Sequence, residues 1–203
     1  MNIIIAGIHT GIGKTICSAV ICQALGYDYW KPVQAGDLEN SDSVFIKKNV
    51  SNSNCNIHPE AYLLNIPASP HYAAAADGLE IKPAGFIIPT TKNNLLIETA
   101  GGIMSPLATG FLNLDLIKQF NFPVILVSNN YLGSINHTLL TVAALQQQNI
   151  LIKGIVFSGE IIASSREFIL QHTKLPMLFS IPQFENINNN SIAAFAKTIS
   201  INL

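Results

Sequence analysis

The sequence contains few charged residues. Asp, Glu, Lys and Arg make up 11% of the 203 residues, and 11 Lys and Arg nearly balance 12 Asp and Glu. Nucleic-acid binding normally needs a concentration of positive charge, so this composition argues against it. Long apolar runs are also missing. Although 49% of the residues are hydrophobic, no uninterrupted apolar stretch reaches the roughly 18 residues expected of a transmembrane helix. We therefore expect a soluble protein with neither a nucleic-acid nor a membrane partner.

Cysteine is scarce too. Cys17, Cys22 and Cys55 show no Cys-x-x-Cys spacing, so buried core thiols are a better interpretation than a metal or redox site. The segment Met1–Ile5 lacks the basic region of a signal peptide, which predicts a cytoplasmic protein. A length of 203 residues fits one domain covering residues 1–203.

The most informative segment that is present is Gly7–Thr15, with the sequence GIHTGIGKT. It follows the apolar run Asn2–Ala6 and precedes a helical pattern over about Thr15–Leu25, which gives the order strand, glycine loop, helix. In a phosphate-binding loop, backbone N–H groups surround phosphate oxygens, the lysine reaches the terminal phosphates and the hydroxyl binds Mg²⁺. Lys14 and Thr15 fit these roles. The spacing is one residue longer than usual, so this is a variant P-loop; the alternative is a glycine turn that only joins a strand to a helix.

Further segments alternate between strand and helix patterns. Such alternation predicts right-handed crossovers and a mostly parallel sheet covered by helices on both faces, that is, a single-domain α/β protein of the P-loop NTPase type. The expected strands are 27–33, 94–98, 122–127, 151–157 and 175–181. One helix is expected to start near residue 42, a second to cover 134–148 and a third to cover about 191–199. Residues 49–56 are expected to form a loop.

Ligands of such sheets bind beyond the carboxyl ends of the strands, where the P-loop, Lys31, Glu98 and 129–133 should meet. Thr15, Asp42 and Glu98 are candidate Mg²⁺ ligands because this ion prefers oxygen donors. Lys31 is a candidate clamp on a transferring phosphoryl group. Each has an alternative: Asp42 as a helix N-terminal residue, Glu98 as half of a structural salt bridge, and Lys31 as a lysine reaching solvent.

The histidines offer no metal site by spacing. His9, His71 and His137 are better interpreted as hydrogen-bonding structural residues than as catalytic bases, and His58 as a surface residue.

Several segments together resemble the dethiobiotin synthetase family. The resemblance runs from the first strand to about residue 157 and more weakly to 182. The segments that carry it, in chain order, are the elongated P-loop, Lys31–Gln34, Asn40–Asp42, Ser69–His71, Glu98–Gly102 and Leu132–His137.

The resemblance implies a homodimeric ligase that uses Mg²⁺ and ATP to close a ureido ring on 7,8-diaminononanoate with CO₂. A substrate amine would capture CO₂ as a carbamate, the carbamate would attack the γ-phosphate, and the second amine would displace phosphate. Lys14 and Lys31 would be the catalytic residues, and Thr15, Asp42 and Glu98 the metal ligands. Nucleotide contacts would come from Gly11, Ile12, Gly13, Lys14, Thr15, Ile16, Asp42, Glu98, Thr99, Ala100, Gly101, Ser158 and Pro182; substrate contacts from Thr10, Lys31, Ala35, Gly133, Ser134 and Asn136, with 133–137 supplied by the partner subunit.

Three positions depart from the family pattern. Ala35 replaces a small hydroxyl residue, His9 replaces an aspartate, and Ser158-Gly159 replaces an asparagine-aspartate pair expected to meet adenine. Loss of that amide predicts weaker discrimination between bases. The competing hypotheses are a nucleotide-driven switch of the partitioning type, a cobyrinate amidation-type domain, and a degenerate family member that binds nucleotide without turnover.

Overall fold

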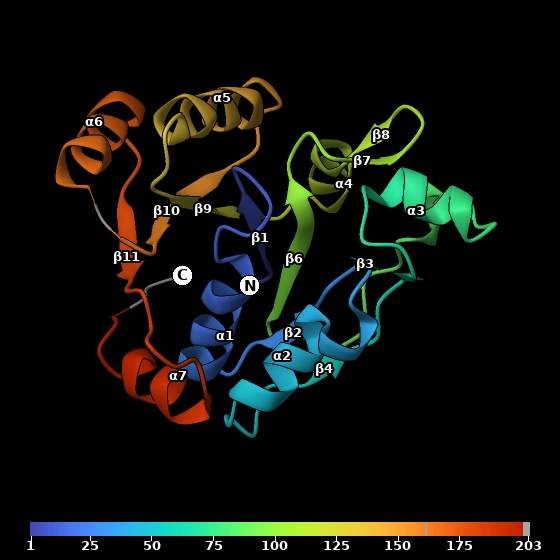
Figure 1. Cartoon of the computed structure of the whole chain (residues 1–203), viewed down its shortest axis with the longest axis horizontal. Coiled ribbons are helices and arrows are strands. Elements are labelled where there is room, and N and C mark those ends of the chain that lie inside the picture. The colour runs from blue at the N-terminus through green and yellow to red at the C-terminus, as the bar shows by residue number, and fades with distance from the viewer. Residues whose placement is uncertain (161, 201–203) are drawn as a thin grey trace.

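A parallel seven-stranded sheet forms the centre of the molecule (Figure 1), in a computed structural model that describes residues 1–160 and 162–200. The strand order is β11-β10-β9-β1-β6-β2-β4, and every neighbouring pair is parallel. The expected mostly parallel sheet is therefore confirmed. The strands are β1 (Ile3–Gly7), β2 (Asp28–Trp30), β4 (Ile57–His58), β6 (Leu95–Gly102), β9 (Val124–Asn129), β10 (Ile152–Ser158) and β11 (Met177–Ile181).

Helices cover both faces of this sheet. In Figure 1, α1, α2 and α7 lie below the sheet, whereas α4, α5 and α6 lie above it. The arrangement explains why the central strands are mostly apolar, since both of their faces are buried. The helices are α1 (Lys14–Leu25), α2 (Asp42–Asn49), α3 (Pro70–Ala76), α4 (Asn113–Phe120), α5 (Ser134–Gln147), α6 (Ala163–Thr173) and α7 (Asn189–Ala196).

Most expected elements occur within one or two residues of their predicted bounds. Ser41 caps α2 by accepting a hydrogen bond from the backbone N–H of Val44, as its position before an apolar face predicts. The final helix starts two residues and ends three residues earlier than expected, after an Asn188 cap, and β6 continues four residues beyond the expected strand end at residue 98. Cys17 and Cys22 are fully buried and Cys55 packs partly against the core, which confirms the prediction of core thiols.

The predicted strand 27–33 is wrong in one respect: it is divided into two strands. β2 ends at Trp30, and β3 (Val33–Ala35) pairs with β5 (Tyr62–Leu64) in a separate two-stranded sheet. Pro32 has no N–H to donate to the ladder, so the strand cannot continue through it. Lys31 therefore lies in the break between β2 and β3. A second small sheet, of β7 (Pro106–Ala108) and β8 (Phe111–Leu112), leads into α4.

The described part of the chain contains no helix of the length and apolar character needed to span a membrane.

Candidate active site

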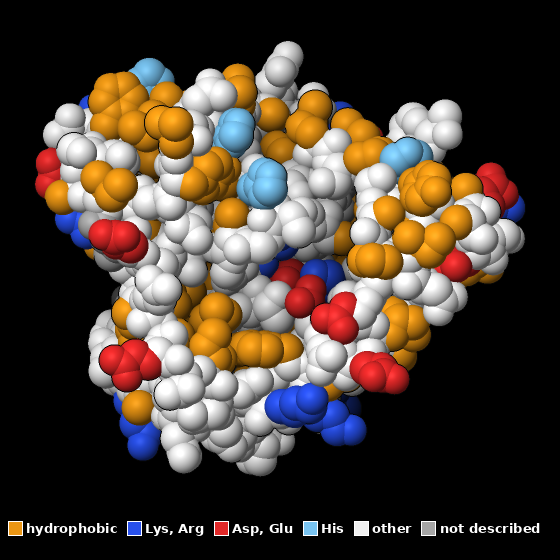
Figure 2. Space-filling model, viewed as in Figure 1, with side chains coloured by type: hydrophobic (Ala, Val, Ile, Leu, Met, Phe, Trp, Pro, Cys, Tyr) orange, Lys and Arg blue, Asp and Glu red, His pale blue; other side chains and the backbone are white. Residues whose placement is uncertain are grey.

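A cavity of about 600 Å³ opens beside the glycine loop that follows β1. Figure 2 shows a hollow near the middle of the molecular face, with acidic and basic side chains gathered inside it. Its walls come from the P-loop, the break after β2, the end of β6 and the segment 67–70 before α3. These are carboxyl ends of parallel strands, the place where this class of sheet binds ligands.

The P-loop leads directly into α1. Gly13 caps the helix with φ 97°, a left-handed conformation that glycine adopts without steric cost. Lys14 is 6% exposed, and its Nζ donates to the carbonyl oxygen of His9 at 3.1 Å. Burial lowers the pKa of Lys14 to about 8, although the nearby Glu98 carboxylate acts in the opposite direction. The ammonium is thus held over the loop, close to where a phosphate would bind.

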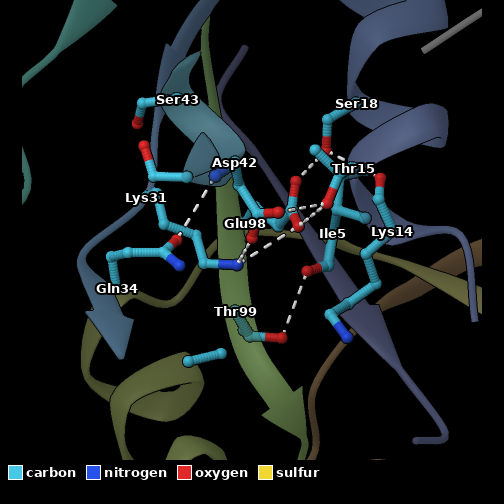
Figure 3. Close-up of polar contacts among 12 residues, drawn as sticks. Ile5, Lys14, Thr15, Ser18, Lys31, Gln34, Asp42, Ser43, Glu98 and Thr99 are labelled. Atoms are coloured by element: carbon cyan, nitrogen blue, oxygen red, sulfur yellow. Dashed lines mark hydrogen bonds and ion pairs between the residues drawn. The ribbon is translucent and has the colours of Figure 1, made fainter. Parts of the chain in front are cut away.

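Thr15, Asp42 and Glu98 meet at the floor of the cavity (Figure 3). The Thr15 hydroxyl lies 2.8 Å from Asp42 Oδ1 and 2.9 Å from Glu98 Oε1. The three residues come from the starts of α1 and α2 and from β6. The structure therefore brings together all three oxygen donors that the sequence suggested as metal ligands. The described residues contain no group of three His, Cys, Asp or Glu side chains placed to hold a metal, so the hydroxyl is needed to complete this set.

Lys31 joins the same cluster. Its ammonium forms an ion pair with Asp42 and lies 3.3 Å from Glu98 Oε1, and the residue is 5% exposed. Burial alone would lower the pKa of Lys31, but the Glu98 and Asp42 carboxylates outweigh burial and raise it. The same ion pair and the Thr15 hydroxyl lower the pKa of Asp42 against the opposing effect of burial. The alternative that Lys31 reaches solvent is wrong.

Two further hydroxyl groups contact Glu98, and the sequence analysis missed both. Ser18 Oγ donates to Glu98 Oε2 at 2.7 Å, and the Tyr29 hydroxyl donates to the same oxygen at 3.1 Å. Burial, followed by the Glu98 charge, raises the pKa of Tyr29 well above its usual value. Ser18 could have been found, because it follows Thr15 by three residues and so shares its helix face. Tyr29 carries no comparable signal, since aromatic residues are common in buried strands.

The sequence analysis also missed one residue that lines the cavity and one that supports its wall from behind. Gln34 lines the cavity, and its Oε1 accepts from the backbone N–H of Asp42 at 3.4 Å. Asn113 at the start of α4 donates to the carbonyl oxygen of Gly102 at 3.0 Å and so supports the loop at the end of β6. Thr10, Gly11, Ala35, Ala100 and Gly101, all expected at the site, also line the cavity.

Other expected nucleotide-binding residues do not line the cavity. Ile12 is buried in the core, Ile16 packs against the core, and the Thr99 hydroxyl donates to the carbonyl oxygen of Ile5 at 3.3 Å. Ser158, at the end of β10, lies against Gly13, where any Cβ would overlap its hydroxyl oxygen. Pro182 is exposed after β11.

The expected carboxylate-binding segment also lies away from this cavity. Gly133 caps α5 with φ 100°, Ser134 is buried and Asn136 is exposed. Within one chain, none of the three lines the cavity.

The histidines make hydrogen bonds rather than a metal site. His71 Nδ1 lies 3.0 Å from Ser69 Oγ, and His137 Nδ1 lies 2.7 Å from the Tyr131 hydroxyl. His58, expected at the surface, is partly buried because its Nε2 lies 3.1 Å from the buried carboxylate of Asp28. This prediction for His58 is wrong, and the reason is the polar cluster around Asp28, which periodicity does not reveal.

A parallel sheet, a glycine loop leading into a helix and a buried lysine above that loop define the chain as a P-loop nucleotide-binding protein. The AAA domain family matches residues 1–191. Among solved structures, the ParA family ATPase from Chlorobium tepidum matches with a TM-score of 0.59 and 11% identity, covering 98% of this chain and 99% of that one. The septum site-determining protein MinD from Pyrococcus horikoshii matches with a TM-score of 0.57 and 14% identity, covering 98% and 96%. At such low identity these similarities show the fold alone.

The sequence comparisons are more specific. An ATP-dependent dethiobiotin synthetase from Cytophaga hutchinsonii is 48% identical over 193 residues, covering 95% of this chain and 93% of the relative. The enzyme of the same name from Chlamydia pneumoniae is 44% identical over 196 residues, covering 97% and 88%. The chain belongs to the ATP-dependent dethiobiotin synthetase family, a family of ATP-using ligases. The resemblance seen in the sequence motifs is therefore confirmed.

Proposed function

We propose that this protein closes the ureido ring of dethiobiotin on 7,8-diaminononanoate, using CO₂ and Mg²⁺-ATP and releasing ADP and phosphate. The observation that carries the proposal is the buried Lys31 ammonium, held by Asp42 and Glu98 beside the P-loop cavity. A P-loop needs one lysine to bind phosphate. A second buried cation in the same cavity suits a reaction in which an anionic substrate attacks that phosphate.

The chemistry takes place in three steps. One amine of the diamine forms a nitrogen–carbon bond with CO₂ and loses a proton, which gives a carbamate. A carbamate oxygen then attacks the γ-phosphorus and ADP leaves. The second amine attacks the carbonyl carbon of the mixed anhydride and loses a proton, and phosphate leaves as the ring closes. Lys14 and Lys31 provide fixed positive charge where negative charge gathers during phosphoryl transfer, and such preorganised electrostatic groups are effective in a water-poor cavity.

Thr15, Asp42 and Glu98 would hold the Mg²⁺ ion. Their hydroxyl and carboxylate oxygens suit a hard cation, and the two carboxylates already attract the cationic Lys31 side chain. When bound, the ion would neutralise charge on the β- and γ-phosphates. The Thr15 hydroxyl carries one proton, which it donates to one of the two carboxylates at a time. Its two oxygen lone pairs are not used in these contacts and can face a cation.

Thr10, Lys31 and Ala35 would contact the diamine or its carbamate within the cavity that they line. Gly133, Ser134 and Asn136 would bind the substrate carboxylate at the cavity of a second subunit, because they do not line the cavity of their own chain. The proposal thus includes a homodimer. Gly11–Ile16, Thr99–Gly101, Ser158 and Pro182 would form the nucleotide side of the site. A cytoplasmic location is part of the proposal and agrees with the use of ATP.

The direct test measures phosphate release from Mg²⁺-ATP and bicarbonate with and without 7,8-diaminononanoate, together with the mass of the product. Diamine-dependent release with one cyclic urea formed per phosphate is the expected result. Release that ignores the diamine would favour a nucleotide switch. Nucleotide binding without release would favour a degenerate family member, and either result would overturn the proposal.

A further inference from the structure

The two carboxylate oxygens of Glu98 have different surroundings. Oε1 lies at the cavity floor, within 2.9 Å of the Thr15 hydroxyl and 3.3 Å of the Lys31 ammonium. Oε2 accepts hydrogen bonds from the hydroxyl groups of Ser18 and Tyr29 at 2.7 and 3.1 Å. Glu98 itself is fully buried. One oxygen therefore faces the candidate reaction site, and the other faces two neutral donors.

These two donors fix the rotation of the carboxylate. The last torsion of a glutamate side chain has broad, shallow preferences, so the carboxylate plane is set by its hydrogen bonds rather than by its own rotamer. Ser18 lies on α1 and Tyr29 on β2, and both residues are fully buried. Donors on two rigid elements hold the same oxygen from two directions, which leaves Oε1 pointing at Thr15 (Figure 3).

Ser18 has a choice of acceptor. Its hydroxyl lies 3.0 Å from the carbonyl oxygen of Lys14 and 2.7 Å from Glu98 Oε2, but it carries one proton. A carboxylate is a stronger acceptor than a neutral carbonyl, so the proton goes to Glu98. The serine thereby links α1, the helix that also carries Lys14 and Thr15, to the orientation of Glu98.

We propose that Tyr29 and Ser18 are positioning residues that hold Glu98 in the orientation in which it binds the divalent cation of the nucleotide complex. The proposal rests on the proposed function, because it concerns the same Thr15, Asp42 and Glu98 site. Neither Ser18 nor Tyr29 lines the cavity. Both act through Glu98, and the loss of partners of this kind typically lowers metal affinity or activity by about 10–100-fold.

The competing interpretation is that Tyr29 and Ser18 only pack in the core. Variants that remove the hydroxyl groups and keep the packing distinguish this from a positioning role. The Tyr29 ring fills the core whether or not it carries a hydroxyl, so Tyr29→Phe keeps the packing and removes only the donor. Ser18→Ala removes the other donor and improves helix propensity in α1. Tyr27→Phe is the matched control, because Tyr27 is 5% exposed and is not among the four donors to Glu98 in the described structure.

The experiment measures the dissociation constant of a non-hydrolysable ATP analogue by calorimetry, once in excess EDTA and once in excess Mg²⁺. The dissociation constant in EDTA divided by the dissociation constant in Mg²⁺ reports how far the cation strengthens nucleotide binding. We expect Tyr29→Phe and Ser18→Ala each to lower this ratio about tenfold, with the constant in EDTA unchanged. The double variant should lose more than the sum of the single effects, because in each single variant the remaining hydroxyl still holds Oε2 in part. Tyr27→Phe should match the wild type.

The possible outcomes are distinct. If the wild type shows the Mg²⁺ effect and Tyr29→Phe, Ser18→Ala and the double variant keep the wild-type ratio, the positioning role is overturned and the proposed function stands. If the variants weaken binding equally in EDTA and in Mg²⁺, the hydroxyls serve the fold of the P-loop and the inference is also overturned. A wild type with no Mg²⁺ effect would remove the metal site from the proposed function, and this inference with it.

Discussion

The Lys31 ammonium lies 3.3 Å from Oε1 of Glu98, although 67 residues separate them in the chain. Asp42 completes the group by pairing with the same ammonium. Lys31 in the break between β2 and β3 and Asp42 at the start of α2 thus bring opposite charges to the Glu98 carboxylate, midway along β6. Two carboxylates share one ammonium in a buried place, so changing any member leaves the others with unbalanced charge.

Lys31→Ala should retain nucleotide binding and lose most of the catalytic rate. Lys14 and the loop backbone still bind phosphate, but the charge that would hold the carbamate is gone. Removal of one preorganised donor commonly reduces kcat by roughly 100–1,000-fold. The measurement is diamine-dependent phosphate release, with calorimetric binding of an ATP analogue alongside. Lys47→Ala, a substitution at an exposed residue of α2, is the control and should behave as the wild type. An unchanged rate in Lys31→Ala would remove this lysine from the mechanism.

Glu98→Gln should destabilise the fold more than Asp42→Asn. Glu98 is fully buried and accepts from four donors, whereas the Asp42 side chain is 29% exposed. Breaking a buried ion pair typically costs about 3–5 kcal/mol, and a pair that water reaches costs less. Midpoints of unfolding in urea, taken at one pH without nucleotide, give the comparison. Equal midpoints, or a lower midpoint for Asp42→Asn, would contradict the claim that burial of Glu98 dominates.

The sequence was a good guide to the central sheet and to the phosphate loop. Strand β1, the first three residues of β6 and the first four of β9 are continuous apolar runs, because both faces of a covered parallel sheet are buried. The glycine loop could be placed because it stands between a strand and a helix. The meeting of Thr15 and Glu98 followed from the rule that strand carboxyl ends gather at one edge. Asp42 lies at the start of a helix, so its place beside them came from its oxygen chemistry and from the family resemblance.

The remaining features depend on contacts that no local pattern encodes. The split of the predicted strand at Pro32 depends on β5, whose partner strand lies about 30 positions earlier in the chain. In the sequence Tyr29 looks like an ordinary core aromatic residue, and only the structure shows that its hydroxyl donates a hydrogen bond to Glu98. In the sequence His58 looks like a surface residue, and only the structure shows that it contacts the buried carboxylate of Asp28.

Asp28 should make the fold sensitive to acid. Burial alone would raise its pKa, but hydrogen bonds from Thr91, Asn56 and His58 outweigh burial and lower it to about 2. A carboxyl group with a lower pKa in the folded chain than in the unfolded chain stabilises the fold above the unfolded value of 3.8, and this stability is lost as the pH falls toward 2. The full contribution is about 2 kcal/mol.

Asp28→Asn tests this dependence. The gap in unfolding free energy between wild type and variant should narrow by about 1 kcal/mol between pH 6 and pH 3, because part of the Asp28 contribution is lost in that range. Urea titrations at several pH values provide the measurement. Glu167→Gln, at an exposed carboxylate of α6, serves as a control for general acid effects. A gap that stays constant with pH would show that the Asp28 cluster does not titrate in this way.

Gly13→Ala should weaken nucleotide binding for two separable reasons. A Cβ at this position would overlap the Ser158 hydroxyl, and the backbone φ of 97° disfavours any residue other than glycine. Adding Ser158→Gly to Gly13→Ala removes the overlap but keeps the backbone strain, which costs roughly 1–2 kcal/mol. Calorimetry with an ATP analogue should therefore show strong loss for Gly13→Ala and partial recovery in the double variant. Ser158→Gly alone is the baseline for this comparison, because Ser158 is itself a proposed nucleotide contact. Recovery to full affinity would show that the overlap, and not the backbone, restricts this position to glycine, whereas no recovery would show that the contact with Ser158 is unimportant.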